Sequence, residues 1–182
     1  LYMLNNLANA LRKKRLREGS IDFDMKENKV ILDKFGKPIE VELRYRGLAE
    51  KLIEEFMIET GTQCSIYLDK QNNNTHIYRN HDLPNEDKLN MFIKYLKTLG
   101  YGKLSSVIKE LKPREIQELL NRIKDKKECE ILERELLKCM AKAVYSTANK
   151  GHFALAKKSY CQTTSPIRRS GDLQNHILIK EN

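Results

Sequence analysis

The chain has 182 residues, of which 40% are hydrophobic and 32% are charged, and its formal net charge is +9. These values favour one globular domain and exclude a disordered chain. No apolar run reaches the roughly 20 residues that a membrane helix needs. Residues 1–16 form an amphipathic pattern rather than a signal peptide. We therefore expect a cytoplasmic protein without a membrane partner.

The charge and the cysteines narrow the choice of partner. The 34 Lys and Arg residues outnumber the 25 Asp and Glu residues, which favours a polyanionic partner and argues against an acidic metal cage. The cysteines are far apart and form no CxxC pair, which argues against a zinc site. We expect reduced, mostly buried thiols at Cys64, Cys129, Cys139 and Cys161.

The chain starts with a helical pattern and continues with strands. Leucines recur at helical spacing over residues 1–11, and Gly19 is expected to end this helix. Apolar and polar residues then alternate over 21–25, 30–32 and 39–45, with a Gly/Pro turn between the last two runs. This alternation predicts an antiparallel meander with one buried face.

A second helix is expected from Gly47 to Thr60, with Gly61 as its C-terminal cap. Residues 63–78 are polar and resemble short strands around a loop at 71–74. Residues 80–85 form a loop whose Pro84 precedes a helix that ends near Gly100.

Residues 104–145 are almost entirely helical in pattern. We expect a short helix, a second from Pro113 to Ile123 and a third from Lys126 to Tyr145. Residues 151–164 are predicted to be extended or irregular, and Ser165-Pro166 should open a final helix. The chain begins inside one helical pattern and ends shortly after the apolar residues 176–179, so we interpret it as an excised piece of a longer protein.

Short strings of residues are more informative than these patterns. Residues 164–169 read TSPIRR and are followed by GDL at 171–173 and by His176. Residues 151–155 read GHFAL, with Tyr160 after them. Other strings are LIEEFM at 52–57, YR at 78–79 with HDLP at 81–84, Met140 with AVYS at 143–146, and SIDFD at 20–24 with Glu27.

Together, and in this order, the strings resemble the catalytic domain of the ribonuclease II/ribonuclease R family, known as the RNB domain. The resemblance covers nearly all of residues 1–182 and implies the C-terminal portion of that domain, closest to ribonuclease R. The fold it implies is α+β, an antiparallel sheet with packed helices. The implied activity is processive 3′-to-5′ hydrolysis of single-stranded RNA to nucleoside 5′-monophosphates.

The family uses magnesium, which activates the attacking water and neutralises the scissile phosphate. Its ligands lie in a GxxxxDxDDA motif that this sequence lacks; the nearest acidic pair is Asp22 and Asp24. We therefore expect the magnesium ligands outside this chain, in the missing remainder of the catalytic domain. We also expect the S1 RNA-binding domain to lie outside the chain, and the isolated chain to be inactive.

The resemblance assigns a catalytic role to Arg168, beside the scissile phosphate, where the planar guanidinium would donate two hydrogen bonds. We place it in the first turn of the final helix, whose free amides attract anions. Arg169 would be a supporting cation or a solvated residue. Thr164 and Ser165, in the same string, are candidate RNA-binding residues.

Three other candidate RNA-binding residues have competing interpretations. Phe23 matches an aromatic that stacks on RNA bases, but its alternation with Ile21 also fits a core residue. Glu55 either shapes the floor of the RNA channel or is an ordinary solvated acid, which we favour. His152 either contacts RNA or is a core histidine bonded to backbone, which we favour.

The sequence departs from the family pattern at Ser170, Thr163 and Gly61, where the family has tyrosine, an aromatic residue and asparagine. The alternative to an enzyme fragment is a non-catalytic protein. It would be an RNA-binding remnant or a helical interaction module built around residues 104–145.

Overall fold

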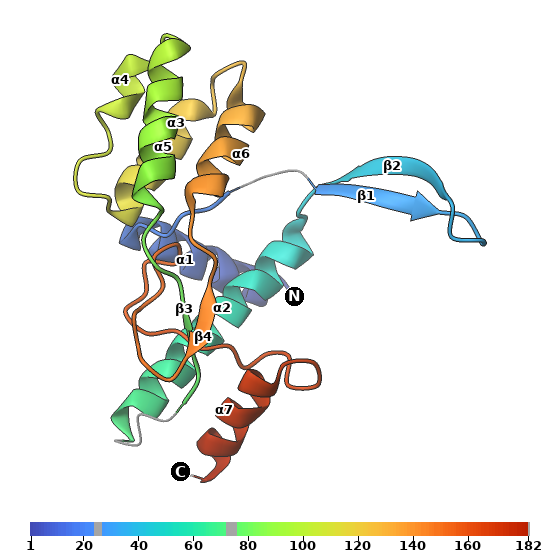
Figure 1. Cartoon of the computed structure of the whole chain (residues 1–182). Helices are drawn as coiled ribbons and strands as arrows, with labels where there is room; N and C mark the ends of the chain where they lie inside the picture. Colours follow the sequence, from blue (N-terminus) through green and yellow to red (C-terminus); the bar gives the residue numbers. More distant parts are fainter. Residues whose placement is uncertain (24–26, 72–75, 182) are drawn as a thin grey trace.

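The computed structural model describes residues 1–23, 27–71 and 76–181 of the chain. Figure 1 shows a group of helices at one end, two long helices beneath it, a small sheet beside them and a hairpin that projects from the body. The helices are α1 (Tyr2–Glu18), α2 (Leu48–Lys70), α3 (Glu86–Thr98), α4 (Gly102–Ser105), α5 (Pro113–Ile123), α6 (Cys129–Cys139) and α7 (Ser170–Glu181). The strands are β1 (Glu27–Leu32), β2 (Pro38–Arg44), β3 (Tyr78–Asn80) and β4 (Val144–Ser146).

The apolar core lies among α3, α5 and α6. Its fully buried side chains include Leu96, Ile116, Leu119, Ile123, Leu132 and Leu136. The bounds predicted for α5, Pro113 to Ile123, are confirmed. The helix begins at Pro113, and the Glu115 carboxylate accepts hydrogen bonds from the backbone amides of Glu110 and Lys112 in front of it. The α+β fold class is also confirmed.

Helix α1 ends as predicted, at Gly19, which has the left-handed φ of 101° that favours glycine. Its apolar stripe is not buried, however, since Leu4 and Leu7 are exposed. The buried residues of this helix are Ala8 and Arg15. One of the two buried side chains of α1 is therefore a charged arginine.

The predicted meander is a single hairpin. β1 pairs antiparallel with β2, and the Asp33 carboxylate accepts from the amides of Phe35 and Lys37 in the turn. The expectation of a buried face is wrong for this hairpin, because every residue of β2 is exposed and the hairpin extends away from the body (Figure 1). Residues 21–23 form no strand, and Asp24 and Met25 lie outside the described residues.

Helix α2 runs past the expected cap at Gly61 and ends at Lys70, so the short strands predicted from residue 63 are wrong up to that point. Gly61 has a packing role instead. A Cβ atom there would lie 2.3 Å from the carbonyl oxygen of Cys161 and 2.7 Å from the ring of Tyr160. The missing side chain thus allows the segment around residue 161 to lie directly against α2. Most of the loop predicted at 71–74 lies outside the described residues.

The third helix predicted for residues 126–145 is shorter than expected. α6 ends at Cys139, Met140 is extended with ψ of 142°, and residues 144–146 form β4. β4 pairs antiparallel with β3, so that Tyr145 lies opposite Arg79. Backbone pairing with a strand distant in sequence overrides the helical pattern here.

All four cysteines are free thiols; Cys139 and Cys161 are buried and the other two are partly buried, in line with the expectation. Burial raises the pKa of the Cys161 thiol to about 12. Across residues 1–23, 27–71 and 76–181, no helix is long and apolar enough to cross a membrane.

Candidate functional site

The TSPIRR string forms a turn in front of α7. The amides of Arg168 and Arg169 both donate to the carbonyl of Ser165, at 3.3 and 3.1 Å. Helix α7 begins only at Ser170, so the expectation that Arg168 lies in the first turn of a helix is wrong. Residues 166–168 form the turn itself, directly before this helix.

Asp172 fastens this turn to the body. Its side chain is 0% exposed, and its Oδ2 accepts from the Ser165 amide at 2.8 Å. The same oxygen accepts from Nε and Nη2 of Arg169, at 3.0 and 2.7 Å. Arg169 also donates to the Thr164 hydroxyl at 3.4 Å. Arg169 is therefore engaged in an ion pair rather than solvated.

Arg168 differs from its neighbour. Its side chain is exposed, and no hydrogen-bond or ion-pair partner for its guanidinium occurs within the described ranges of the chain. The five N–H donors of an arginine in this state remain available to an external anion. The sequence-based assignment of Arg168 to a phosphate fits this exposure, and the role itself stays a prediction.

The middle of α7 is tied to the residue before β3 by the buried side-chain amide of Asn175. Asn175 accepts from the Ile77 amide at 2.8 Å and donates to the carbonyls of Ile77 and Gln162, at 3.0 and 3.1 Å. The His176 ring lies 2.5 Å from the carbonyl oxygen of Thr163. These contacts fix α7, and with it the turn that carries Arg168.

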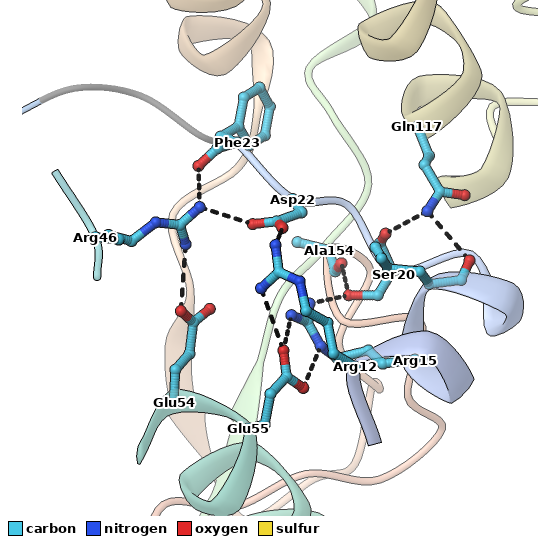
Figure 2. A network of polar contacts seen from close by, with 11 residues as sticks. Arg12, Arg15, Ser20, Asp22, Phe23, Arg46, Glu54, Glu55, Gln117 and Ala154 are labelled. Atoms are coloured by element: carbon cyan, nitrogen blue, oxygen red, sulfur yellow. Dashed lines mark hydrogen bonds and ion pairs between the residues drawn. The ribbon is translucent and has the colours of Figure 1, made fainter. Parts of the chain in front are cut away.

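A second polar cluster lies between α1 and α2, as Figure 2 shows. Arg15 and Glu55 are 4% and 2% exposed and form two hydrogen bonds, at 3.0 and 2.5 Å. Burial lowers the pKa of Arg15, but its hydrogen bond to Glu55 and the charge of Glu55 raise it overall. The expectation of a solvated acid at Glu55 is wrong, since α1 covers that carboxylate.

The cluster continues to the segment after α1. Asp22 pairs through one oxygen with Arg12 and through the other with Arg46, the latter at 3.0 Å. Arg46 also pairs with Glu54 at 3.2 Å (Figure 2). Carbonyl and hydroxyl groups of Ser20, Phe23 and Ala154 complete the set. We call Arg12, Arg15, Asp22, Arg46, Glu54 and Glu55 the interhelical ion-pair network.

The residues described do not fit a magnesium site. Both oxygens of Asp22 are engaged by arginines, and Glu55 faces Arg15. No group of three or more His, Cys, Asp or Glu side chains suited to a metal occurs among the described residues. Asp24 lies outside those residues. Magnesium prefers carboxylate oxygens that are free to coordinate, so no step of the chemistry is assigned to a metal here.

Phe23 lies where the network meets the core. Its ring is partly buried and packs against the apolar cluster of α3, α5 and α6, and its carbonyl accepts from Arg46 at 3.2 Å. Figure 2 shows the ring on the side away from Arg46. Partial burial is compatible with both interpretations of Phe23, so stacking on RNA stays a prediction.

His152 is packed inside the segment that reads GHFAL. Its ring lies 5.0 Å from that of His81 and 5.3 Å from that of Tyr160, and its Nδ1 accepts from the Leu155 amide at 3.2 Å. Burial, followed by the charges of His81 and Arg79, lowers the pKa of His152 to about 3. This geometry matches a packed, neutral histidine bonded to backbone, and a contact with RNA stays a prediction.

The ion pairs that hold this site together were not predicted from the sequence. Asp172 stands three positions after Arg169, a spacing that places both side chains on one face of a helical turn and could have indicated the pair. Arg15 and Glu55 are 40 positions apart and belong to separate helices, so no local pattern links them.

The family model for the RNB domain matches residues 1–182. Among curated proteins, "Ribonuclease R 1" of Lactococcus lactis is 38% identical over 178 residues, which are 98% of this chain and 21% of the relative. Among solved structures, the apo form of Mycoplasma genitalium RNase R has a TM-score of 0.89 and 28% identity, over 97% of this chain and 27% of that one. The same enzyme in complex with ribose methylated single-stranded RNA matches equally well, with a TM-score of 0.89. The chain thus spans about a fifth to a quarter of the length of these relatives.

Proposed function

The chain belongs to the RNB domain family, and on that premise we propose that it forms the RNA-contacting part of a 3′-to-5′ exoribonuclease. The observation that carries the proposal is the exposed guanidinium of Arg168 on a turn fastened by Asp172. The M. genitalium relative has been solved with single-stranded RNA, which supports the same class of ligand for this chain. The net charge of +9 favours a polyanion in general.

In this proposal Arg168 donates two hydrogen bonds to oxygens of the scissile phosphate. A planar guanidinium on a fixed turn is already oriented before the substrate arrives, so it stabilises the negative charge that builds up during hydrolysis. Arg169 does not compete for the phosphate, because Asp172 holds it. It keeps the turn in shape instead.

In this proposal the metal chemistry is supplied from outside these 182 residues. We place the magnesium ligands in the remainder of the catalytic domain, which must contact these 182 residues for hydrolysis to occur. Processive release of nucleoside 5′-monophosphates and a cytoplasmic location are parts of the same proposal. So is the inactivity of the isolated chain.

The test compares the isolated chain with a chimera. In the chimera, these 182 residues replace the matching segment of the Lactococcus lactis ribonuclease R. Both proteins are incubated with Mg²⁺ and a 5′-labelled poly(A) strand, and their thermal melting is recorded to establish folding. We expect the chimera to shorten the strand from its 3′ end and the isolated chain to leave it intact.

Two outcomes contradict the proposal in different ways. Shortening of the strand by the isolated chain would show that the metal ligands lie within these 182 residues. A folded chimera that binds poly(A) without shortening it would favour the non-catalytic RNA-binding alternative.

A further inference from the structure

A second RNA contact is indicated by a cross-strand pair beside the turn of Arg168. Arg79 on β3 lies directly opposite Tyr145 on β4, so their side chains share one face of the small sheet. The guanidinium carbon of Arg79 lies 4.5 Å from the centre of the Tyr145 ring. The flanking residues of β3, Tyr78 and Asn80, are buried on the other face. Arg79 and Tyr145 therefore form the outward face of the sheet.

The Tyr145 ring is held in one orientation although much of it is open. Its hydroxyl donates to Oε1 of Gln162 at 2.6 Å, and a Cβ atom on Gly171 would lie only 3.7 Å from the ring edge. Arg79 stacks against it in cation–π geometry. The side chain nevertheless remains 46% exposed. An aromatic ring that is fixed before binding loses little conformational freedom when a planar ligand stacks on it.

The same contacts place the ring next to the proposed phosphate site. Gln162 precedes the TSPIRR turn and accepts from the Tyr145 hydroxyl, and Gly171, which follows the turn, lies beside the Tyr145 ring. β4 accordingly ends close to the beginning of α7, as can be followed in Figure 1. A nucleotide whose phosphate reaches Arg168 thus has an exposed aromatic ring within its surroundings.

We propose that Tyr145, backed by Arg79, is a stacking platform for a nucleobase of single-stranded RNA. The proposal rests on the proposed function, since it assumes that RNA passes the Arg168 turn. Stacking uses the π-face that every base has, so the platform is indifferent to base identity. The charge of Arg79 adds to the attraction for RNA, because no carboxylate pairs with its guanidinium within the described parts of the chain.

The experiment separates stacking from every other contribution of Tyr145. Fluorescence anisotropy gives the dissociation constants of the 182-residue chain for oligo(A) and for an abasic ribose-phosphate strand of equal length. The variants are Tyr145→Leu, which keeps apolar bulk without a ring, and Tyr145→Phe, which keeps the ring without the bond to Gln162. Tyr45→Leu is the matched control, because Tyr45 is a 63% exposed tyrosine beyond the end of β2.

We expect Tyr145→Leu to weaken oligo(A) binding by about 5- to 140-fold, the loss of one base–aromatic stack. The abasic strand should bind the wild type and this variant equally. Tyr45→Leu should bind oligo(A) nearly as the wild type does. Tyr145→Phe should lose much less affinity than Tyr145→Leu, because the ring remains and only its bond to Gln162 is removed.

Unchanged oligo(A) binding by Tyr145→Leu would overturn the platform alone and leave the proposed function intact. An equal loss for both strands would also overturn it, because the residue would then act through the fold or the phosphates. A lower melting temperature of the variant would indicate an effect on the fold, and an unchanged one an effect on phosphate binding. A wild-type chain that binds neither strand would contradict the proposed function itself.

Discussion

The interhelical ion-pair network around Glu55 and the turn that carries Arg168 both contain an arginine bound to a buried carboxylate. In the network the pair is Arg15 with Glu55, and in the turn it is Arg169 with Asp172. The two regions differ in whether their other arginines are also paired. The arginines of the network are all paired, whereas the turn pairs one arginine and leaves Arg168 exposed.

The difference separates residues that stabilise the fold, such as Arg15 and Glu55, from an exposed residue that the fold holds in place for a ligand, such as Arg168. A buried charge without a partner is costly, so Arg15 and Glu55 must stay together whatever the function. An exposed guanidinium has no such requirement, and its position on a fixed turn is therefore free to serve a ligand. Matching a family motif does not by itself tell these two classes apart.

The largest effect is expected from breaking the network at its centre. Glu55→Gln leaves the buried Arg15 charge without its hydrogen-bonded carboxylate and should lower the free energy of unfolding by about 3–5 kcal/mol. Glu54→Gln is the control, because Glu54 is more exposed and should lose no more than about 1 kcal/mol. Urea unfolding of both variants measures the difference.

The double replacement Arg15→Met with Glu55→Leu sharpens the same point. It removes both charges, so most of the stability should return. If Glu55→Gln were as stable as the wild type, the network would have no role in holding α1 to α2.

A smaller effect is expected at Phe23. Because its ring is partly covered by the core, Phe23→Ala should lower stability by about 1–2 kcal/mol, less than the 3–5 kcal/mol of a fully buried phenylalanine. If the exposed part also stacks on RNA, the active chimera should leave a different shortest product. Melting combined with product length separates the two roles. A large loss of stability with unchanged products would make Phe23 a core residue alone.

Near neutral pH the smallest effect is expected at His152, and this effect grows as the pH falls. Its pKa falls from 6.5 to about 3 in the folded chain because the ring is buried beside His81. Between these values the unfolded chain binds the additional proton, so stability decreases as the pH falls below about 6.5. The loss attributable to His152 is about 1.4 kcal/mol per pH unit.

His152→Asn keeps an acceptor for the Leu155 amide and removes the titrating ring. Unfolding free energies at pH 7, 6 and 5 should therefore decrease less steeply for the variant than for the wild type. Parallel curves would show that folding does not lower the pKa of His152, and would reopen its contact with RNA as an explanation of its position.

The sequence predicted the elements whose signals are local. Helix α5 begins at a proline and ends after a continuous apolar stripe, and α1 ends at a glycine with positive φ. Gly61 misled because the same residue type that caps helices also permits close packing inside one. β4 was not predicted because its partner strand lies more than 60 positions away, and pairing over that distance produces no periodic pattern in the local sequence.

The site shows the same division. The TSPIRR string identified Arg168 as a candidate phosphate contact, since the residues of that string are adjacent in sequence. The exposure of that arginine, the engagement of Arg169 by Asp172 and the burial of Glu55 under α1 depend on tertiary packing. The proposed platform at Tyr145 could not be predicted from the sequence either, because Arg79, Gln162 and Gly171 are brought beside Tyr145 only by tertiary packing.

The most direct test of the claim that Arg168 serves the ligand rather than the fold is Arg168→Lys in the active chimera. The variant keeps the charge and removes the planar fork. Arg122→Lys, at an exposed arginine on α5, is the matched control. Single-turnover hydrolysis and equilibrium binding of poly(A) are measured for both. We predict that Arg168→Lys slows hydrolysis by about 100- to 1,000-fold while the dissociation constant changes far less. Hydrolysis at the wild-type rate would remove Arg168 from the mechanism, and a loss confined to binding would make it an RNA contact only.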